Sequence, residues 1–422
     1  MSGQLHVVGG GISGLAAAVL AMRAGWRPVV HEAAPQPGGR CRTVRRGDIS
    51  HDNGTHVLLS ANRATLRLLD AVGAAGRWVE PEPDGLPVLD LESGRLDRVG
   101  LSPWSWLRPG SRPMGLAPRD LLRLARIAVL PGRRSVAAAA GDAPGLARML
   151  DLMAVAVLNT TGAAASATLL ARVLRRMAMP GGTRLLVART GLGPDLVQPL
   201  ADAVMKGGEI RLGRRLRAIE QADGQAVALR FGGGTVQLEA GDRVVLALPP
   251  AAAASVLPGL PVPTRFAPIV NLHFPHNGED PIRFAGITGG IGQWLLVRPG
   301  MASVTISAGF EALELPGETL AARVWPEVTA TTARLGIGLP GGGPENACVV
   351  KERFATPFQD DAQARARRPG RTPLRNLALA GDWTTGLPAT IEAAVVAAGQ
   401  AVQRLGRPAT ERAGTRMADA TA

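Results

Sequence analysis

Residues 5–14, with the sequence LHVVGGGISG, constrain the fold of this chain more than any other stretch. An apolar run leads into residues 9–14, which match the pattern G-x-G-x-x-G, and an Ala- and Leu-rich segment follows. Gly9 allows a tight turn, Gly11 lets a phosphate approach the backbone, and Gly14 lets the next helix pack closely on the strand. This spacing predicts a strand, a turn and a helix that together bind a dinucleotide.

The residues that follow the turn complete the expected nucleotide site. A helix should run to Gly25, and its first turn, which includes Ser13, would present free N–H groups and a positive dipole end to the phosphates. A second apolar strand, 27–31, ends at Glu32, where an acid binds ribose hydroxyls. This order favours a dinucleotide site over a structural glycine turn, but it does not separate FAD from NAD.

The segment 32–60 resembles flavin amine oxidases and carotenoid desaturases. The turn 38–40 (GGR) matches the continuation of their FAD fingerprint, and 52–56 (DNGTH) matches a segment near their flavin ring. An arginine in such a turn is a charge-assisted donor to phosphate. The resemblance therefore implies FAD as the cofactor. It assigns the following residues to cofactor binding: Gly39, Arg40, Gly54, Thr55, His56 and, through its backbone near the adenine, Leu216.

The segment 376–402 (NLALAGDWTTGLPATIEAAVVAAGQAV) is expected to form the other half of the site. The resemblance implies a buried strand, 377–380, after which Gly381 allows close approach of the backbone and Asp382 binds the ribityl-phosphate region. Pro388 suits the first turn of the Ala-rich helix that follows. The free N–H groups of that helix start would stabilise negative charge on the reduced flavin. They belong to Ala389, Thr390 and Ile391.

The whole chain resembles bacterial hydroxysqualene dehydroxylases. The similarity is densest in 4–60, 209–250, 265–310 and 347–402. It implies an FAD-dependent removal of the hydroxyl group from a long apolar isoprenoid, hydroxysqualene, to give squalene and water. Oxidative desaturation of a polyene and a non-catalytic prenyl-lipid carrier remain alternatives. Amine oxidation is disfavoured because the chain contains no Tyr, and Thr390 stands where amine oxidases place a tyrosine beside the flavin.

A hydroxyl is a poor leaving group, so this reaction needs a proton donor. A buried acid with a raised pKa is one possible source. The candidates are Asp52, His56 and Glu392. The sequence contains no H-E-x-x-H and no G-x-S-x-G motif, and Cys41 and Cys348 lack metal-type spacing, so neither a metal centre nor a serine hydrolase is expected.

The predicted fold class is α/β, with a Rossmann-like FAD-binding domain and an inserted α+β substrate domain. The FAD-binding domain is discontinuous because its motifs lie at both ends of the chain. Its expected segments are 1–75, 195–255 and 350–405. The substrate domain would comprise 76–194 and 256–349, with 134–145 as a flexible loop. The tail, 408–422, is expected to be disordered.

The formal net charge is +13, and all but two of the 47 basic residues are Arg. Such a surface attracts anions, but aromatic residues are only 3% and the arginines are dispersed, which argues against nucleic-acid binding. The helix expected over 118–130 carries Arg119, Arg123 and Arg126 on one face, a pattern typical of membrane-surface helices and also of ordinary surface helices. We expect a cytoplasmic protein with peripheral contact to the inner face of the cell membrane. The electron donor is not specified by the sequence.

Overall fold

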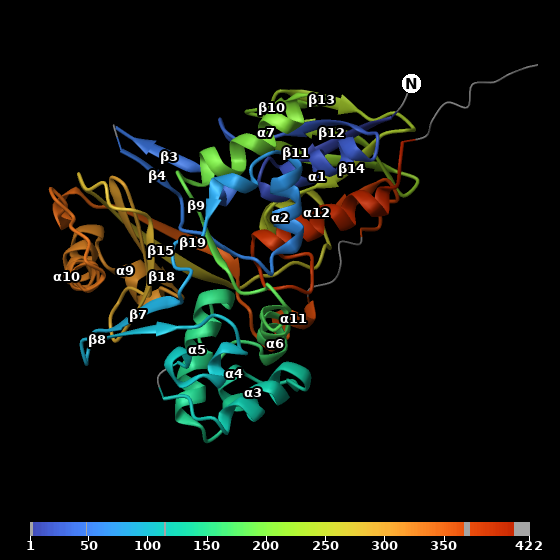
Figure 1. Ribbon diagram of the computed structural model, residues 1–422. Coiled ribbons are helices and arrows are strands. Elements are labelled where there is room, and N and C mark those ends of the chain that lie inside the picture. Colours follow the sequence, from blue (N-terminus) through green and yellow to red (C-terminus); the bar gives the residue numbers. More distant parts are fainter. Residues whose placement is uncertain (1–2, 48, 114, 367–371, 409–422) are drawn as a thin grey trace, which may run out of the picture.

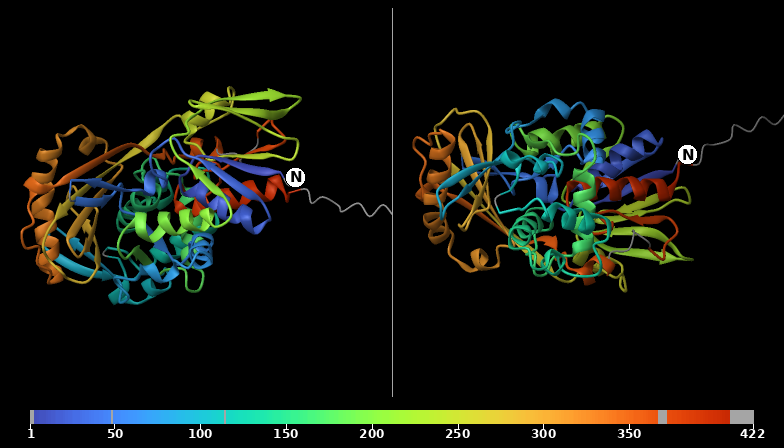
Figure 2. Two further views of the ribbon diagram at one scale, coloured as in Figure 1. Left: turned by 90° about the horizontal axis from the view of Figure 1, so that it is seen from above. Right: turned by 60° about the horizontal axis from the view of Figure 1, so that its bottom comes forward.

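The computed structural model describes residues 3–47, 49–113, 115–366 and 372–408. Figure 1 shows three regions: a parallel sheet flanked by helices, a long antiparallel sheet, and a bundle of short helices below them. The views in Figure 2 place the antiparallel sheet at one end of the molecule and the parallel sheet near the other. The expected tail lies outside the described residues, apart from Pro408.

The parallel sheet has five strands in the order β10-β2-β1-β14-β20. They are β1 (Gln4–Val8), β2 (Arg27–His31), β10 (Glu209–Arg211), β14 (Arg243–Leu246) and β20 (Leu377–Leu379). All four pairings are parallel. The carboxyl ends of strands from both termini of the chain therefore meet at one edge of the sheet, the edge where α/β folds bind ligands.

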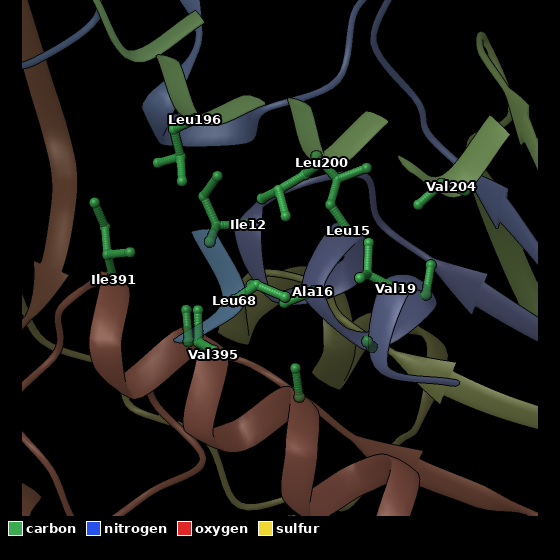
Figure 3. Close-up of a cluster of buried hydrophobic side chains, with 14 of the residues drawn as sticks. Ile12, Leu15, Ala16, Val19, Leu68, Leu196, Leu200, Val204, Ile391 and Val395 are labelled. Carbon is green, nitrogen blue, oxygen red and sulfur yellow. The ribbon is translucent and has the colours of Figure 1, made fainter. Parts of the chain in front are cut away.

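Helices pack on this sheet through an apolar cluster (Figure 3). They are α1 (Ile12–Arg23), α2 (Arg63–Ala71), α7 (Gln198–Met205), which continues the single π-turn η5 (Gly193–Val197), and α12 (Ile391–Leu405). Leu15 and Ala16 of α1 are fully buried in the cluster. Burial of apolar side chains is the main force that holds such layers together. The arrangement confirms the predicted Rossmann-like fold.

The seven-stranded sheet has the order β19-β15-β18-β17-β16-β7-β8. Its strands are β7 (Leu86–Asp90), β8 (Arg95–Val99), β15 (Phe266–Pro275), β16 (Arg283–Thr288), β17 (Trp294–Arg298), β18 (Met301–Ser307) and β19 (Cys348–Pro357). The boundary expected at 350 falls within β19, which pairs with β15 along the edge of this sheet.

The two faces of the seven-stranded sheet differ in character because successive side chains of a strand alternate between them. One face carries apolar residues such as Leu272 and Val304 beneath α9 (Phe310–Glu314) and α10 (Gly317–Leu335). The opposite face carries buried polar residues on β15 and β18. They are Asn271, His273, Ser303 and Thr305.

The helical bundle consists of α3 (Asp120–Val129), α4 (Val136–Ala140), α5 (Pro144–Leu158) and α6 (Ala167–Met177). The expectation of a flexible loop over 134–145 is wrong. The Ser135 hydroxyl accepts the N–H of Ala138 and caps α4, and buried Val136 and Ala140 join the core of the bundle. A favourable N-cap and apolar burial therefore stabilise a helix of only five residues.

The remaining strands form three smaller sheets. They are the hairpin of β3 (Thr43–Arg46) and β4 (Ile49–Asp52), the sheet of β5 (Val57–Leu59), β9 (Leu185–Ala188) and β6 (Trp78–Val79), and the meander of β11 (Leu216–Ala222), β12 (Gln225–Phe231) and β13 (Gly234–Gln237). The last two helices are α8 (Pro250–Val256) and α11 (Asp361–Ala366). Within the described residues, no helix combines the length and apolarity needed to span a bilayer.

Candidate flavin site

The turn between β1 and α1 requires two of its three motif glycines for internal reasons. Gly9 has φ +107°, and a side chain there would overlap the backbone carbonyl of Ala247. A side chain at Gly14 would overlap the carbonyl oxygen of Gly9. These two glycines therefore shape the turn and let α1 pack tightly against β1.

Gly11 has no such internal reason to be glycine. It is the N-cap of α1 with φ −71°, and the nearest atom to a side chain built there is the Cα of Gly39, at 4.0 Å. The space in front of the helix N-terminus is therefore left open by the protein. Such a space, lined by free N–H groups, fits the diphosphate of FAD.

The second glycine turn lies directly against the first. The N–H of Gly38 donates to the carbonyl of Gly10 over 2.8 Å, and Gly39, with φ +56°, lies close to Gly11. The two motifs that the sequence places some 30 residues apart thus form one cradle. The side chain of Ser13 is not available to it, because its hydroxyl donates to the carbonyl of Ala394 over 2.9 Å. Only its backbone N–H can serve a phosphate.

Glu32 lies at the end of β2, as predicted. Its Oε2 accepts the N–H of Gly10 over 2.6 Å, and its Oε1 accepts the N–H of Ala34 over 2.7 Å. An ionised carboxylate has about four acceptor positions, so it retains capacity for ribose hydroxyls. The N–H of Arg214 donates to the Glu32 carbonyl, and Leu216 begins β11 two residues later. Both predicted adenosine contacts therefore lie on adjacent segments.

Arg40 and Asp382 join the two halves of the site. Arg40 Nη2 lies 2.8 Å from Asp382 Oδ1, and the carboxylate raises the pKa of Arg40 although burial opposes the charge. Gly381 packs against the indole ring of Trp383, which leaves no room for a side chain. The cation and the anion stand beside the glycine cradle, where Arg40 can meet phosphate and Asp382 can accept from ribityl hydroxyls.

The start of the last helix differs from the expectation. α12 begins at Ile391, not at Pro388, and Thr390 is its N-cap, with a hydroxyl that accepts the N–H of Ala393. The N–H of Ala389 donates to Gln359 Oε1 over 3.0 Å. Ala389 is therefore engaged within the protein, and of the three predicted donors the N–H groups of Thr390 and Ile391 remain for a flavin.

Glu392 is enclosed by hydrogen-bond donors from α2. Its Oε2 accepts the N–H and the hydroxyl of Thr65 over 2.9 and 2.8 Å, and its Oε1 accepts the N–H of Ala64 over 3.1 Å. Arg176 lies 3.8 Å away. The carboxylate therefore caps the N-terminus of α2 across the domain, a geometry typical of a structural brace.

Asp52 has a comparable environment at the end of β4. Its Oδ1 accepts from the Thr43 hydroxyl over 2.8 Å and from the N–H of Leu192 over 2.9 Å. Its Oδ2 lies 3.4 Å from the Nη1 of Arg298. Both oxygens thus connect the β3-β4 hairpin to neighbouring segments.

His56 is the remaining candidate for a proton donor. Its Nδ1 lies 3.1 Å from the carbonyl of Gly54, and its Nε2 lies 4.0 Å from Cys41 Sγ. Burial opposes a charge on the ring, but the Cys41 sulfur and the Gly54 carbonyl outweigh it and raise the pKa of His56 to about 9.

Three contributors to this region were not predicted as site residues. Cys41 faces His56, Gln359 binds the N–H of Ala389, and Asn271 accepts the N–H of Thr55 over 3.3 Å. A signal was present for Asn271 alone, because it is a single amide within the apolar run 267–272.

The glycine cradle, the acid after β2 and the Arg-Asp pair define a dinucleotide site of the FAD type. Residues 12–325 match the family of flavin containing amine oxidoreductases, and the chain belongs to this family and uses FAD as its cofactor. Among solved structures, the fold is similar to an oxidoreductase from Methanosarcina mazei (TM-score 0.69, 16% identity, 94% of this chain and 98% of that one) and to cyclohexylamine oxidase from Brevibacterium oxydans (TM-score 0.66, 16% identity, 96% and 99%).

Two relatives are similar over nearly the whole chain. The hydroxysqualene dehydroxylase of Rhodopseudomonas palustris is 39% identical over 94% of this chain and 96% of its own length. The hydroxysqualene dehydroxylase of Sinorhizobium fredii is 36% identical over the same shares of the two chains. This chain is an FAD-dependent oxidoreductase of the flavin containing amine oxidoreductase family.

Proposed function

We propose that this protein removes the hydroxyl group of hydroxysqualene and releases squalene and water. The observation that carries the proposal is the 39% identity, over 94% of the chain, to a relative with that name. The complete cofactor cradle also supports it, because a carrier protein without catalysis has no need for a redox cofactor.

The chemistry has simple requirements. The bound cofactor, once reduced, would supply a hydride to the carbon that loses oxygen. The C–O bond breaks with its electron pair on oxygen, and a proton converts the departing group to water. Alkenes next to the reacting carbon delocalise the positive charge that develops there. The protein must therefore provide a proton donor, orient the C–O bond and exclude bulk water.

We assign the proton donor to His56. Both oxygens of Asp52 and of Glu392 face donors from the protein, which leaves neither carboxyl directed at a substrate. The imidazole of His56 stands beside Gly54 and Thr55, in the segment predicted to approach the flavin. Its Nδ1 faces the Gly54 carbonyl, so the proton would come from Nε2, whose recorded contact among the described residues is the long one of 4.0 Å to Cys41 Sγ. An imidazolium can deliver its proton to a hydroxyl oxygen without leaving a buried negative charge.

The test uses the purified holoenzyme. Flavin absorbance first establishes cofactor content, the cofactor is reduced anaerobically with dithionite, and hydroxysqualene is added in detergent micelles. We expect squalene, detected by mass spectrometry, and stoichiometric reoxidation of the flavin. His56→Gln should keep the flavin spectrum and lower the rate about 10²- to 10⁴-fold, the range for loss of a general acid. Insertion of double bonds into squalene or phytoene, without conversion of hydroxysqualene, would overturn the proposal.

Amine oxidation is the related activity that the site supports least. The chain contains no Tyr, and Thr390 uses its hydroxyl to cap α12 rather than to line a cage. The polyene desaturase remains a distinct outcome of the assay above, because it requires electron flow in the opposite direction.

We further propose that the helical bundle contacts a membrane from one side. Among the residues that the structure describes, six of the eleven exposed large apolar side chains belong to two neighbouring segments, 104–130 and 178–179. They are Trp104, Leu107, Leu122, Val129, Leu130 and Met179. The segments are joined because Trp104 donates to the carbonyl of Ala178 and Arg175 donates to that of Ala128. An apolar surface of this kind marks an interaction site.

The charges around this surface indicate an anionic partner. Arg119, Arg123, Arg126 and Arg134 line a hollow of about 470 Å³ beside Leu122. Within the described ranges, none of the four forms an ion pair with a carboxylate. Each arginine near an anionic bilayer contributes about 1 kcal/mol. We therefore infer peripheral binding at the inner face of the cell membrane, close to an apolar substrate.

Sedimentation with liposomes tests this contact. The protein should bind vesicles that contain phosphatidylglycerol, bind phosphatidylcholine vesicles less, and dissociate as salt increases. Leu122→Glu with Val129→Glu should abolish binding, whereas Met205→Glu, at an exposed methionine on α7, should not. If the Leu122→Glu, Val129→Glu double variant bound the vesicles as well as Met205→Glu does, this surface would not be the membrane contact.

A further inference from the structure

Asn271 is a buried amide in which the carbonyl oxygen, but not the NH₂ group, has hydrogen-bond partners in the described part of the chain. It lies on β15 and is 1% exposed. Its Oδ1 accepts the N–H of Thr55 over 3.3 Å and the hydroxyl of Thr305 over 2.9 Å. Because a backbone N–H can only donate, the oxygen must face Thr55, and the NH₂ group must point elsewhere. Among the described residues, no hydrogen-bond acceptor is recorded for that NH₂ group.

The unpaired NH₂ group lies beside Gly54. A side chain built on Gly54 would be 3.4 Å from Asn271 Nδ2 and 3.4 Å from the Cε1 of His56. The amide and the imidazole ring therefore both lie next to the same glycine. These separations are ordinary contact distances, so neither neighbour excludes a side chain at Gly54. The glycine thus leaves a small space between a neutral donor and an imidazole.

The Nδ2 atom of Asn271 is not one of the fully enclosed unpaired polar atoms of the described residues, so it reaches an accessible space rather than being sealed in the core. A donor held at the edge of such a space is available to a ligand. The anchor Thr305 belongs to β18, and Thr55 belongs to the loop before β5, so the amide is held where the seven-stranded sheet meets the predicted flavin segment. A ligand oxygen at this junction would satisfy it.

We propose that Asn271 donates a hydrogen bond to the substrate hydroxyl that leaves. The inference rests on the proposed function and names the group that recognises its substrate. The hydroxyl oxygen receives the proton of His56 and keeps a lone pair for Asn271 while the C–O bond breaks. The amide is neither an acid nor a base at neutral pH, so its role is to orient the C–O bond and to select the hydroxylated compound.

This role predicts a difference between substrate and product. Squalene lacks the oxygen, so its binding leaves the Asn271 donor unpaired in a buried site. A donor left unpaired in this site weakens the binding of a ligand without the matching oxygen by about 10- to 100-fold. Hydroxysqualene should therefore bind the oxidised enzyme 10- to 100-fold more tightly than squalene, which also favours release of the product.

The experiment measures binding without turnover. Both ligands are titrated into the oxidised holoenzyme, and the flavin difference spectrum gives the two dissociation constants. Asn271→Leu, which removes the donor at similar volume, should bring their ratio close to 1 and lower kcat/KM about 10- to 100-fold. Thr305→Val removes one anchor of the amide and should reduce the ratio several-fold. Ser303→Ala, one same-face position earlier on β18, should leave the ratio unchanged.

The outcomes separate this inference from the proposed function. An unchanged ratio in Asn271→Leu, or equal binding of the two ligands by the unmodified protein, overturns the role of Asn271 even if squalene is produced. Loss of flavin from Asn271→Leu with an unchanged ratio in the remaining holoenzyme also overturns it and assigns the amide to the cofactor. A failure of turnover with a retained preference for hydroxysqualene contradicts the proposed reaction and leaves the recognition by Asn271 intact.

Discussion

Replacement of Glu392 distinguishes a structural brace from a catalytic acid. Glu392→Ala removes the acceptor of three hydrogen bonds from Ala64 and Thr65 at the start of α2. A hydrogen bond to a charged group contributes about 1.5–3 kcal/mol. The three share one carboxylate, and Ala64 is only half-buried, so water can replace part of the loss. We expect a decrease of about 3 kcal/mol in the free energy of unfolding, between one full bond and the sum of three.

Glu392→Gln separates the two roles because it is neutral yet keeps one oxygen. Directed at Thr65, that oxygen can still accept two of the three bonds, but the amide NH₂ group then faces the Ala64 N–H. The decrease in stability should therefore be about 2 kcal/mol, smaller than in Glu392→Ala. Urea unfolding followed by circular dichroism measures both variants, and squalene formation below the unfolding transition measures kcat. For a brace, kcat stays within about threefold of the unmodified protein, whereas loss of a general acid lowers it by about 10²-fold or more. A large fall in kcat with unchanged stability in Glu392→Gln would refute the brace.

Three further predictions concern the cofactor site. Gly11→Ala should leave the stability of the apoprotein unchanged but weaken FAD binding, measured by titration of the apoprotein, whereas Gly14→Ala should destabilise the apoprotein itself. Asp382→Ala should weaken FAD binding about 10- to 100-fold by loss of charge-assisted contacts, and full flavin retention would contradict its role. The raised pKa of His56 predicts that kcat falls as the pH rises through about 9, and that the stability from the charged ring, complete below pH 6.5, is lost over the same rise. A flat rate profile to pH 10 would count against His56.

Local sequence patterns predicted the nucleotide-binding part of the fold because each element carries its own physical signal. Gly14 is needed for a close contact with Gly9, five residues earlier, and Gly9 itself has the positive φ of +107° that the tight turn requires. Local patterns could not show that β19 belongs to the seven-stranded sheet. That assignment depends on its pairing with β15, more than 70 residues earlier. A strand carries no local mark of its sheet.

In the candidate site, too, local features were predictable from the sequence and distant contacts were not. The glycines and acids of the cradle are visible as motifs, but their partners are not. The last helix was expected to include Pro388 in its first turn, but α12 begins at Ile391. Just before that start, Gln359 accepts the N–H of Ala389. The carboxylate of Glu392 is bound by Thr65, which lies 327 residues away in sequence. Such hydrogen bonds depend on the completed packing, and a single sequence does not specify which distant donor will arrive.

Arg40 shows why the two halves of the site must form together. Its guanidinium binds Asp382, 342 residues later, and also the carbonyl of Ala355 on β19. One side chain thus contacts the loop after the parallel sheet and the edge strand of the antiparallel sheet. An arginine with a rigid planar fork holds such partners in fixed directions. We therefore expect phosphate binding at the cradle to be coupled to the position of the sheet that carries Asn271, the residue proposed to bind the substrate hydroxyl.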